Sequence, residues 1–197
     1  LSVAAKKLNI KTIIYCDDKD APAQNFCDEF IFGSYKDREK IIEFVNKVNV
    51  VTFEFENIPY QTLSEINKIK TVLPKPSINR IIQHRLAEKD FINKLNIRTT
   101  RYASIEKRSD LNTLEDLLPG ILKTTTMGYD GKGQYPVKKI TDLDSLNIDF
   151  SKGYILEKLV RLKKEISVII TRFGNNRYEI YEPIENTHEN QILKYSK

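Results

Sequence analysis

Apolar residues in the first third of the chain form short β-branched runs that alternate with helical stripes. Four such runs have the pattern of buried strands, at 11–16, 30–32, 50–55 and 71–73. Between the last three, apolar residues recur at helical spacing over 37–48 and 59–69. Strands that alternate with helices in this way predict βαβ units in a doubly wound sheet.

The amino end departs from that plan. Apolar residues of 1–9 share one helical stripe, and Lys6 and Lys7 stand near its end, so this segment has the pattern of the back half of a helix. A doubly wound sheet has a central first strand whose following turn carries the ligand-binding glycines. Neither precedes the run at 11–16, and we expect the sheet to lack its central strand.

From residue 77 the pattern changes. Two helical stretches over 77–94 meet near 83–85, and a further helix is expected around 110–118. Strands are expected at 100–102, 121–125, 134–138, 154–157, 165–171 and 177–181. The second and third of these predict a hairpin with a mobile flap, and the Gly-Asn-Asn turn at 174–176 predicts another. We expect the polar run 182–197 to contain no packed element.

Composition excludes several classes of protein. A chain of 197 residues, 40% hydrophobic and 30% charged, suits one large or two small globular domains. No apolar run approaches the roughly 18 residues that span a bilayer, and the amino end has no signal-peptide order. Cys16 and Cys27 are too few for a disulfide scaffold, and no ligand-spaced Cys or His makes them a zinc site. We expect a cytoplasmic protein without a membrane partner, and both cysteines reduced and buried.

The net charge of +5 raises the question of a nucleic-acid partner. Basic and acidic residues are interspersed, as over 36–47 and 101–116, which is typical of solvated helix faces. The densest basic stretch, 161–164, ends at Glu165, and neither an RNA-binding aromatic signature nor a helix-turn-helix pattern accompanies it. We expect no nucleic-acid partner, and a basic RNA-binding interaction protein stays an alternative.

Three of the seven glycines, Gly128, Gly131 and Gly133, fall within six residues. Glycines can point successive N–H groups into one concavity that holds phosphate oxygens, and Lys132 adds a cation. The loop is no Walker loop, because Gly133 stands where Ser or Thr is required, and no dinucleotide fingerprint. A plain hairpin loop is the alternative.

Lys123 lies in the apolar strand that enters this loop. A lysine is costly to bury unless an anion meets it, so Lys123 favours an anion site, with a snorkelling lysine at a sheet edge as the alternative. Glu157 ends one strand and Glu165 opens the next. Together the two carboxylates can frame a nucleotide, with strand-end backbone facing adenine and a carboxylate accepting from ribose hydroxyls. Taken singly, each is a surface residue.

Five motifs, taken together, resemble a known enzyme family. They are Thr52-Phe53-Glu54-Phe55-Glu56-Asn57-Ile58-Pro59, Gln83-His84-Arg85-Leu86-Ala87-Glu88-Lys89, Ile121-Leu122-Lys123, 128–134 and Glu185-Asn186-Thr187-His188. In this order they resemble the N5-carboxyaminoimidazole ribonucleotide synthetases, ATP-grasp enzymes of purine biosynthesis, from residue 1 to about 196. The resemblance implies an α/β chain: a Rossmann-like pre-ATP-grasp domain over 1–76, lacking its first strand, and an incomplete ATP-grasp domain over 77–197. Its flap subdomain would cover about 100–157.

The resemblance also implies which residues hold the nucleotide. Arg85 and Lys123 match cations on the ATP phosphates. The flap that closes over them matches Gly128, Tyr129, Asp130, Gly131, Lys132, Gly133 and Gln134. The hinge whose backbone pairs with adenine matches Glu157, Lys158, Leu159 and Val160. Arg85, Lys123 and His188 are the candidate catalytic residues.

Two further sets of residues follow from the same resemblance. Glu165 matches the ribose-binding acid, and His188 matches a histidine of the nucleotide site, although the sequence alone favours an exposed loop histidine. The segment that faces the ribonucleotide matches Glu54, Glu56 and Asn57, and which of the three makes contact is open.

The family reaction joins ATP, bicarbonate and 5-aminoimidazole ribonucleotide. Bicarbonate attacks the γ-phosphate to give carboxyphosphate, which delivers its carboxyl group or CO2 to the exocyclic amine and leaves ADP and phosphate. Catalysis of this kind is mostly positioning and charge neutralisation, and a closed flap protects carboxyphosphate from water. The resemblance thus implies ATP as cofactor, the ribonucleotide and bicarbonate as partners, and the homodimer that members commonly form.

Two parts of the family pattern are missing from the chain. The amino end lacks the first strand and its Gly-Gln-Leu-Gly type loop, and the carboxyl end lacks the segment with the Mg2+-binding acid and asparagine. Mg2+ is expected for the family, so without its ligands the phosphate charge is left largely to Arg85, Lys123 and Lys132. We expect a domain fragment of a longer enzyme, or a split-gene remnant that binds ATP weakly and is inactive alone.

Overall fold

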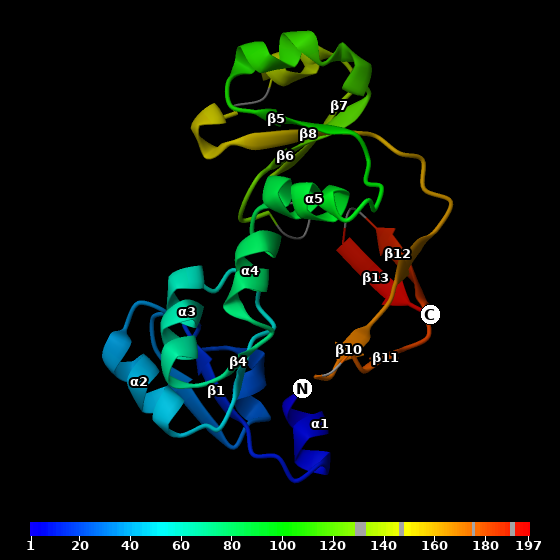
Figure 1. Ribbon diagram of the computed structural model, residues 1–197. Helices are drawn as coiled ribbons and strands as arrows, with labels where there is room; N and C mark the ends of the chain where they lie inside the picture. Colours follow the sequence, from blue (N-terminus) through cyan, green and yellow to red (C-terminus); the bar gives the residue numbers. More distant parts are fainter. Residues whose placement is uncertain (129–132, 146–147, 175, 190–191) are drawn as a thin grey trace. The chain divides into compact units, whose positions relative to one another are not determined.

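The computed structural model describes residues 1–128, 133–145, 148–174, 176–189 and 192–197. Within them the chain forms two compact units, Leu1–Glu88 and Lys89–Lys197 (Figure 1). The domain boundary placed after residue 76 stays a prediction. No described helix is both long enough and apolar enough to cross a membrane.

The first unit alternates strands and helices, as predicted. Its elements are α1 (Ser2–Lys7), β1 (Ile13–Cys16), a 3-10 turn (Pro22–Asn25), β2 (Glu29–Phe32), α2 (Arg38–Asn46), β3 (Val51–Thr52), α3 (Tyr60–Ile69), β4 (Val72–Leu73) and α4 (Pro76–Ile82). Asp37 begins α2 by accepting a hydrogen bond from the Lys40 N–H, and Pro59 is the residue directly before α3. Strands β3 and β4 are only two residues long, shorter than predicted.

The strands of this unit do not form one sheet. Strand β1 pairs in parallel with β2, and β3 pairs in parallel with β4. No described strand joins the two pairs. A single core nevertheless covers both pairs, because Val45 of α2 and Leu63 of α3 pack with Val51 and Val72.

The second unit is built on a four-stranded antiparallel sheet. Its strands are β5 (Tyr102–Ile105), β6 (Gly120–Thr124), β7 (Gln134–Val137) and β8 (Tyr154–Lys158), in the order β5-β8-β6-β7. The predicted hairpin is confirmed as β6 and β7. Strand β5 begins where the expected strand at 100–102 ends. The helix expected over 110–118 is two 3-10 turns, Arg108–Thr113 and Glu115–Leu117.

The two faces of this sheet differ in character. Leu122 of β6 and Leu156 of β8 point to one face, where Leu111 and Leu117 of the 3-10 turns complete a buried core. Because side chains alternate along a strand, Lys123 and Glu157 point to the other face. Helix α5 (Arg85–Lys94) lies on that face and is seen beneath the sheet in Figure 1.

The remaining segment forms short strands with exposed side chains: β9 (Glu165–Ser167), β10 (Ile170–Arg172), β11 (Tyr178–Ile180), β12 (Ile184–Glu189) and β13 (Ile192–Ser196). The hairpin expected at the Gly-Asn-Asn turn is confirmed as β10 and β11, although the run 165–171 breaks into β9 and β10. Two further 3-10 turns, Ile140–Ser145 and Phe150–Lys152, precede β8.

The expectation that 182–197 holds no packed element is wrong. Strand β12 pairs with both β13 and β9 to make a three-stranded antiparallel sheet. Polar side chains join these strands, because the Asn186 amide donates to Ser167 and the Ser196 hydroxyl donates to Asn186. A sheet held by polar cross-strand pairs carries no apolar alternation in its sequence.

The cysteines also differ from expectation. Cys16 and Cys27 are free, but both are partly exposed and not buried. Cys16 ends β1 and Cys27 follows the 3-10 turn, and each lies where the chain leaves a short element at the surface.

Gly120 sets how closely β6 approaches its neighbours. A Cβ added there would lie 2.7 Å from the carbonyl oxygen of Glu157 and 2.8 Å from that of Leu117. We expect Gly120→Ala to lower the free energy of unfolding by about 1 to 3 kcal/mol, because backbone must move to admit the methyl group. Urea unfolding followed by circular dichroism measures it.

Gly174→Ala is the matched control, since a Cβ there meets nothing within 4 Å. Its free energy of unfolding should stay within about 0.5 kcal/mol of the parent chain. Equal midpoints for the two variants would show that the close approach at Gly120 does not constrain the sheet.

Candidate functional site

Lys123 and Glu157 form a part-buried ion pair on the inner face of the second unit. Lys123 Nζ lies 3.0 Å from Glu157 Oε2, and the two side chains are 20% and 11% exposed. Strand β6 lies between β8 and β7, so Lys123 is not a snorkelling lysine at a sheet edge. The anion expected beside Lys123 is thus present within the protein, and Glu157 is not the surface residue that it would be if taken singly.

Helix α5 brings a second cation to the same carboxylate. Lys89 Nζ lies 3.4 Å from Glu157 Oε1, and the Lys89 side chain is 15% exposed. Sequence reasoning assigned Lys89 no role, although it quoted the motif that contains it. The available signal was spacing, because Lys89 stands one helical turn after Arg85, the first residue of α5.

The hinge residues are held mainly by backbone bonds of the fold. The Lys158 N–H donates to the carbonyl of Arg101, and the Leu159 N–H donates to that of Pro119. The Lys158 ammonium donates to the carbonyl of Asp116, so this side chain points toward the 3-10 turn Glu115–Leu117. In the described part of the chain the Val160 N–H makes no hydrogen bond, and Val160 is exposed.

Glu165 and His188 come together from β9 and β12. His188 Nδ1 lies 3.2 Å from Glu165 Oε2, and the side chains are 35% and 45% exposed. The β12–β13 register shifts between Thr187 and His188, a bulge that re-aims the side chains that follow it. His188 therefore lies in a strand and not in a loop.

The flap is described only at its base. Gly133 has a φ of +68°, and its carbonyl accepts from the Thr124 N–H at 2.9 Å, which closes the β6–β7 hairpin. A left-handed backbone favours glycine, so the residue type is required here. Gly128 and Gln134 flank the loop, while Tyr129, Asp130, Gly131 and Lys132 lie outside the described residues.

In the first unit, two of the quoted motifs meet. The Gln83 amide nitrogen donates to the carbonyl of Ile58 at 2.6 Å and also to that of Glu56. The Asn79 amide donates to the same Glu56 carbonyl. This anchoring fixes the backbone of the segment 54–57, in which the Glu54 and Glu56 side chains are exposed and Asn57 is partly exposed. Arg85 is also partly exposed.

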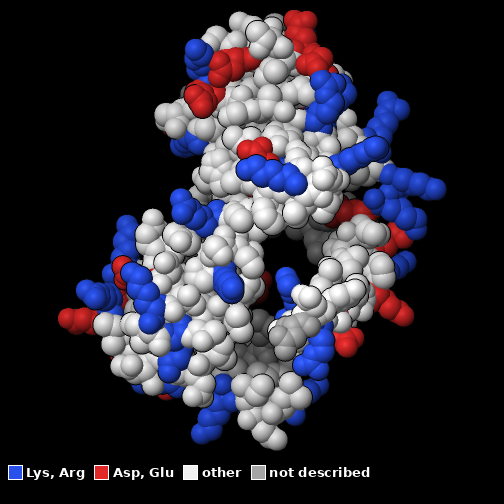
Figure 2. Space-filling view, in the orientation of Figure 1, with Lys and Arg blue, Asp and Glu red and all other residues white. Residues whose placement is uncertain are grey.

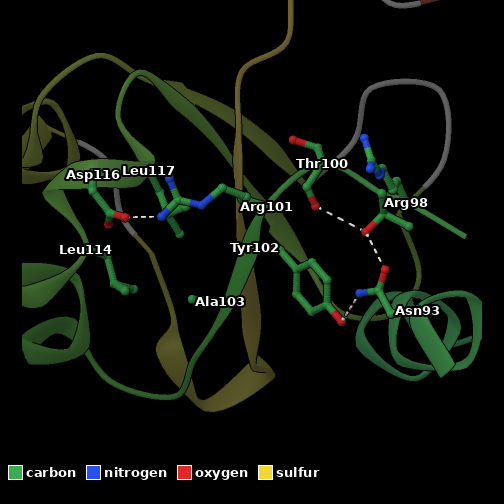
Figure 3. Close-up of a pocket in the computed structure, with 10 residues that line it drawn as sticks. Asn93, Arg98, Thr100, Arg101, Tyr102, Ala103, Leu114, Asp116 and Leu117 are labelled. Carbon is green, nitrogen blue, oxygen red and sulfur yellow. Dashed lines mark hydrogen bonds and ion pairs between the residues drawn. The ribbon is translucent and has the colours of Figure 1, made fainter. Parts of the chain in front are cut away.

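A hollow of about 480 Å³ opens at the start of β5 (Figure 3). It is lined by Asn93, Arg98, Thr99, Thr100, Arg101, Tyr102, Ala103, Leu114, Asp116 and Leu117. None of the residues predicted to hold the nucleotide lines it. Its polar groups largely bond one another, since Arg101 pairs with Asp116 and the Asn93 amide donates to the Tyr102 hydroxyl. Thr100, one of the lining residues, also helps to hold the hinge, because its hydroxyl donates to the Lys158 carbonyl.

The described residues do not fit a bound Mg2+. Among them no group of three or more His, Cys, Asp or Glu side chains is placed to hold a metal ion. Glu157 is the acid at the cation cluster, and both of its oxygens face lysines. No step of the chemistry can be assigned to a metal held by these side chains.

An antiparallel sheet that carries a lysine and a carboxylate on its inner face, with a glycine hairpin and an open connector beside them, is typical of an α/β nucleotide-binding enzyme. Comparison with known families agrees. The chain belongs to the ATP-grasp family: residues 90–197 match the ATP-grasp domain, and residues 1–83 match the ribonucleotide synthetase preATP-grasp domain. The α/β fold expected from the sequence is thereby confirmed.

Within this family, the chain is similar to N5-carboxyaminoimidazole ribonucleotide synthases. The N5-carboxyaminoimidazole ribonucleotide synthase of Bacillus subtilis is 34% identical over 98% of this chain and 52% of its own length. The structure of the Staphylococcus aureus N5-carboxyaminoimidazole synthetase complexed with ADP has a TM-score of 0.91 and 30% identity, over 98% of this chain and 52% of that one. The Aspergillus clavatus carboxyaminoimidazole ribonucleotide synthase complexed with ATP has a TM-score of 0.82 and 26% identity, with the same coverage of 98% and 52%.

These relatives confirm the resemblance read from the five motifs. The chain spans about half the length of the relatives it matches. What the whole enzymes do is therefore a proposal for this chain, and so is the role of each residue above.

The Glu165–His188 pair is partly exposed, so it should add little to stability. We expect His188→Gln to change the free energy of unfolding by less than about 1 kcal/mol, whereas Leu156→Ala, at a buried core position, should cost about 2 to 5 kcal/mol. Urea unfolding of both variants measures this. A loss at His188 that equals the loss at Leu156 would contradict it and give His188 a structural role.

Proposed function

We propose that this chain supplies the ATP site of an ATP-dependent carboxylation of 5-aminoimidazole ribonucleotide. The observation that carries the proposal is the pairing of Lys123 with Glu157 on the inner face of the ATP-grasp sheet. A buried ammonium that already faces a carboxylate is held in place and oriented before any phosphate arrives, which is the preorganisation that charge stabilisation requires.

Each part of a nucleotide has a matching group in this proposal. The phosphates meet Lys123, while Arg85 and the loop 128–134 stay phosphate contacts predicted from the sequence. Adenine rests on the hinge, where the Val160 N–H makes no bond in the described chain and so can donate to a ring nitrogen. Glu165 is exposed and is the first residue of β9, seven residues after β8 ends at Lys158, where it can accept from the ribose hydroxyls.

For the complete enzyme we propose the reaction that the family resemblance implies. A bicarbonate oxygen attacks the γ-phosphorus, the bond from that phosphorus to the β,γ-bridging oxygen breaks, and ADP leaves. The exocyclic amine of the ribonucleotide then attacks the carboxyl carbon of carboxyphosphate, phosphate leaves, and the nitrogen loses a proton. Lys123 and Arg85 neutralise charge on the transferred group, and the closed flap excludes water.

The segment 54–57 is proposed to face the ribonucleotide. Its backbone is fixed by Gln83 and Asn79, which leaves the carboxylates of Glu54 and Glu56 free to approach a ligand. Mg2+ is the metal that the family implies, and no described residue cluster of this chain supplies its site. For the chain by itself we therefore propose ATP binding without turnover. A homodimer, bicarbonate binding and a cytoplasmic location stay predictions from the sequence.

The face drawn in Figure 2 carries no continuous basic surface that would favour RNA as the ligand. On the face drawn in Figure 2, Lys and Arg stand in several separate groups among Asp and Glu. Phosphate-backbone binding needs a continuous basic surface and weakens steeply as salt rises. Retention of the chain on an RNA matrix at moderate salt would reverse this preference.

ATP titration tests the phosphate end of the site. We expect Lys123→Ala to weaken ATP binding by about tenfold or more, because a hydrogen bond to a charged group contributes about 1.5 to 3 kcal/mol. Calorimetry of the parent chain and the variant measures it. Lys94→Ala, which removes an exposed lysine near the end of α5, is the control and should bind as the parent does. Equal heats for the parent and Lys123→Ala would remove the nucleotide site.

The ribose end has its own test. Glu165→Ala should weaken ATP binding by about 1.5 to 3 kcal/mol through the lost bonds to the ribose hydroxyls. The same change should cost less with 2′-deoxy-ATP, because one of those hydroxyls is then missing from the ligand. If the variant loses both nucleotides equally, the carboxylate acts elsewhere.

A further inference from the structure

Lys89 is a partly buried charge to which the proposed nucleotide site assigns no role. Its side chain is 15% exposed, and its ammonium lies 3.4 Å from Glu157 Oε1. Removing an ammonium from water is costly, and a long flexible lysine can usually extend to keep its ammonium in solvent. That Lys89 is nevertheless enclosed beside Glu157 indicates a role at this carboxylate.

Strand β5 and helix α5 hold Lys89 in place together. The ammonium lies 5.5 Å from the ring centroid of Tyr102, which stands opposite Glu157 in the β5–β8 register. The Tyr102 hydroxyl donates to Asp90 at 2.6 Å and accepts from the Asn93 amide at 2.9 Å, as Figure 3 shows for Asn93. The hydrogen bond to Asp90 raises the pKa of Tyr102 above its ordinary value. Two residues of α5 thus fix the ring over which Lys89 lies.

The charges at this site do not balance. Glu157 offers one negative charge and two oxygens, and each oxygen faces a different lysine. In the absence of nucleotide the three side chains therefore carry a net charge of +1. A buried carboxylate that loses its only cation is strongly destabilised, whereas one that keeps a second cation is not.

We propose that Lys89 is a positioning residue for the triphosphate, because it keeps Glu157 neutralised when Lys123 turns from that carboxylate to a phosphate oxygen. Lys89 does not touch the nucleotide. It removes the cost that would otherwise tie Lys123 to Glu157, and it holds the carboxylate at the end of β8 where the hinge begins. This inference rests on the proposed ATP site and gives that site a residue that sequence reasoning did not assign.

The consequence is a coupling between Lys89 and Lys123 that runs through Glu157. If Lys89 is replaced by an uncharged residue, Glu157 should retain Lys123, and the phosphates should bind less tightly. If Glu157 is neutral as well, nothing retains Lys123, and the loss of Lys89 should matter little. A purely structural role for Lys89 predicts the same loss in both backgrounds.

The experiment is ATP titration of the full 197-residue chain by calorimetry, with four changes. Lys89→Met should weaken ATP about tenfold, which is within the coupling range of neighbouring residues. Lys89→Arg keeps the charge and should bind within about threefold of the parent. Lys94→Met removes an exposed charge from the same helix and should leave the affinity unchanged. In a Glu157→Gln background, Lys89→Met should cost less than about threefold.

Three results would overturn the positioning role: unchanged affinity in Lys89→Met, no recovery in Lys89→Arg, or an equal loss in the Glu157→Gln background. Should Glu157→Gln fail to fold or to bind ATP, the comparison of Lys89→Met with Lys89→Arg still tests whether the charge of Lys89 is required. If the parent chain takes up no ATP, the proposed function itself fails. If the parent binds and Lys89→Met binds as well, only the role of Lys89 fails.

Discussion

The site depends on one buried carboxylate held between two lysines. Glu157 is the second-last residue of β8, and its two oxygens face Lys123 from β6 and Lys89 from α5. Buried charges must be paired, so this cluster ties the helix to the sheet and fixes the inner face on which a phosphate can be met. Apolar side chains of similar volume at the same positions would fill the space without the cost of removing charges from water. The charges are therefore better explained by ligand binding than by stability.

Strand register makes that cluster possible. In an antiparallel sheet, alternate residues face opposite sides, and Leu122 and Leu156 fill the core while Lys123 and Glu157 point away from it. A slip by one residue would place both charges in the apolar core. Gly120 lets β6 approach the Glu157 backbone closely, and Gly133 closes the hairpin through a left-handed φ. The two glycines thus permit the strand pairing in which Lys123 and Glu157 face away from the core.

Much of the fold could be predicted from the sequence, because hydrophobic period carries the signal where one face of an element is buried. The helices of the first unit, the β6–β7 hairpin and the β10–β11 hairpin have this signal. The β12–β13 hairpin does not, since polar pairs such as Asn186 with Ser196 hold it together and leave no apolar alternation to read. Of the site, Lys123 could be found because a lysine in an apolar strand requires an anion. Lys89 was missed, because its spacing of one helical turn from Arg85 is a weak signal until the fold shows that it faces Glu157.

The two ends of the proposed nucleotide site differ in how firmly they are built. At the phosphate end, both lysines and their carboxylate are largely buried, so their arrangement is fixed before a ligand arrives and any change in it is costly. At the ribose end, Glu165 and His188 are partly exposed, and opening their contact costs at most about 1 kcal/mol. In the proposed site, a pair of ribose hydroxyls would displace His188 from Glu165 at little cost, whereas a phosphate would draw Lys123 from Glu157 while Lys89 keeps that carboxylate paired. The proposed site would thus have its most firmly held charges where phosphate charge develops, and a readily opened contact where a neutral sugar would bind.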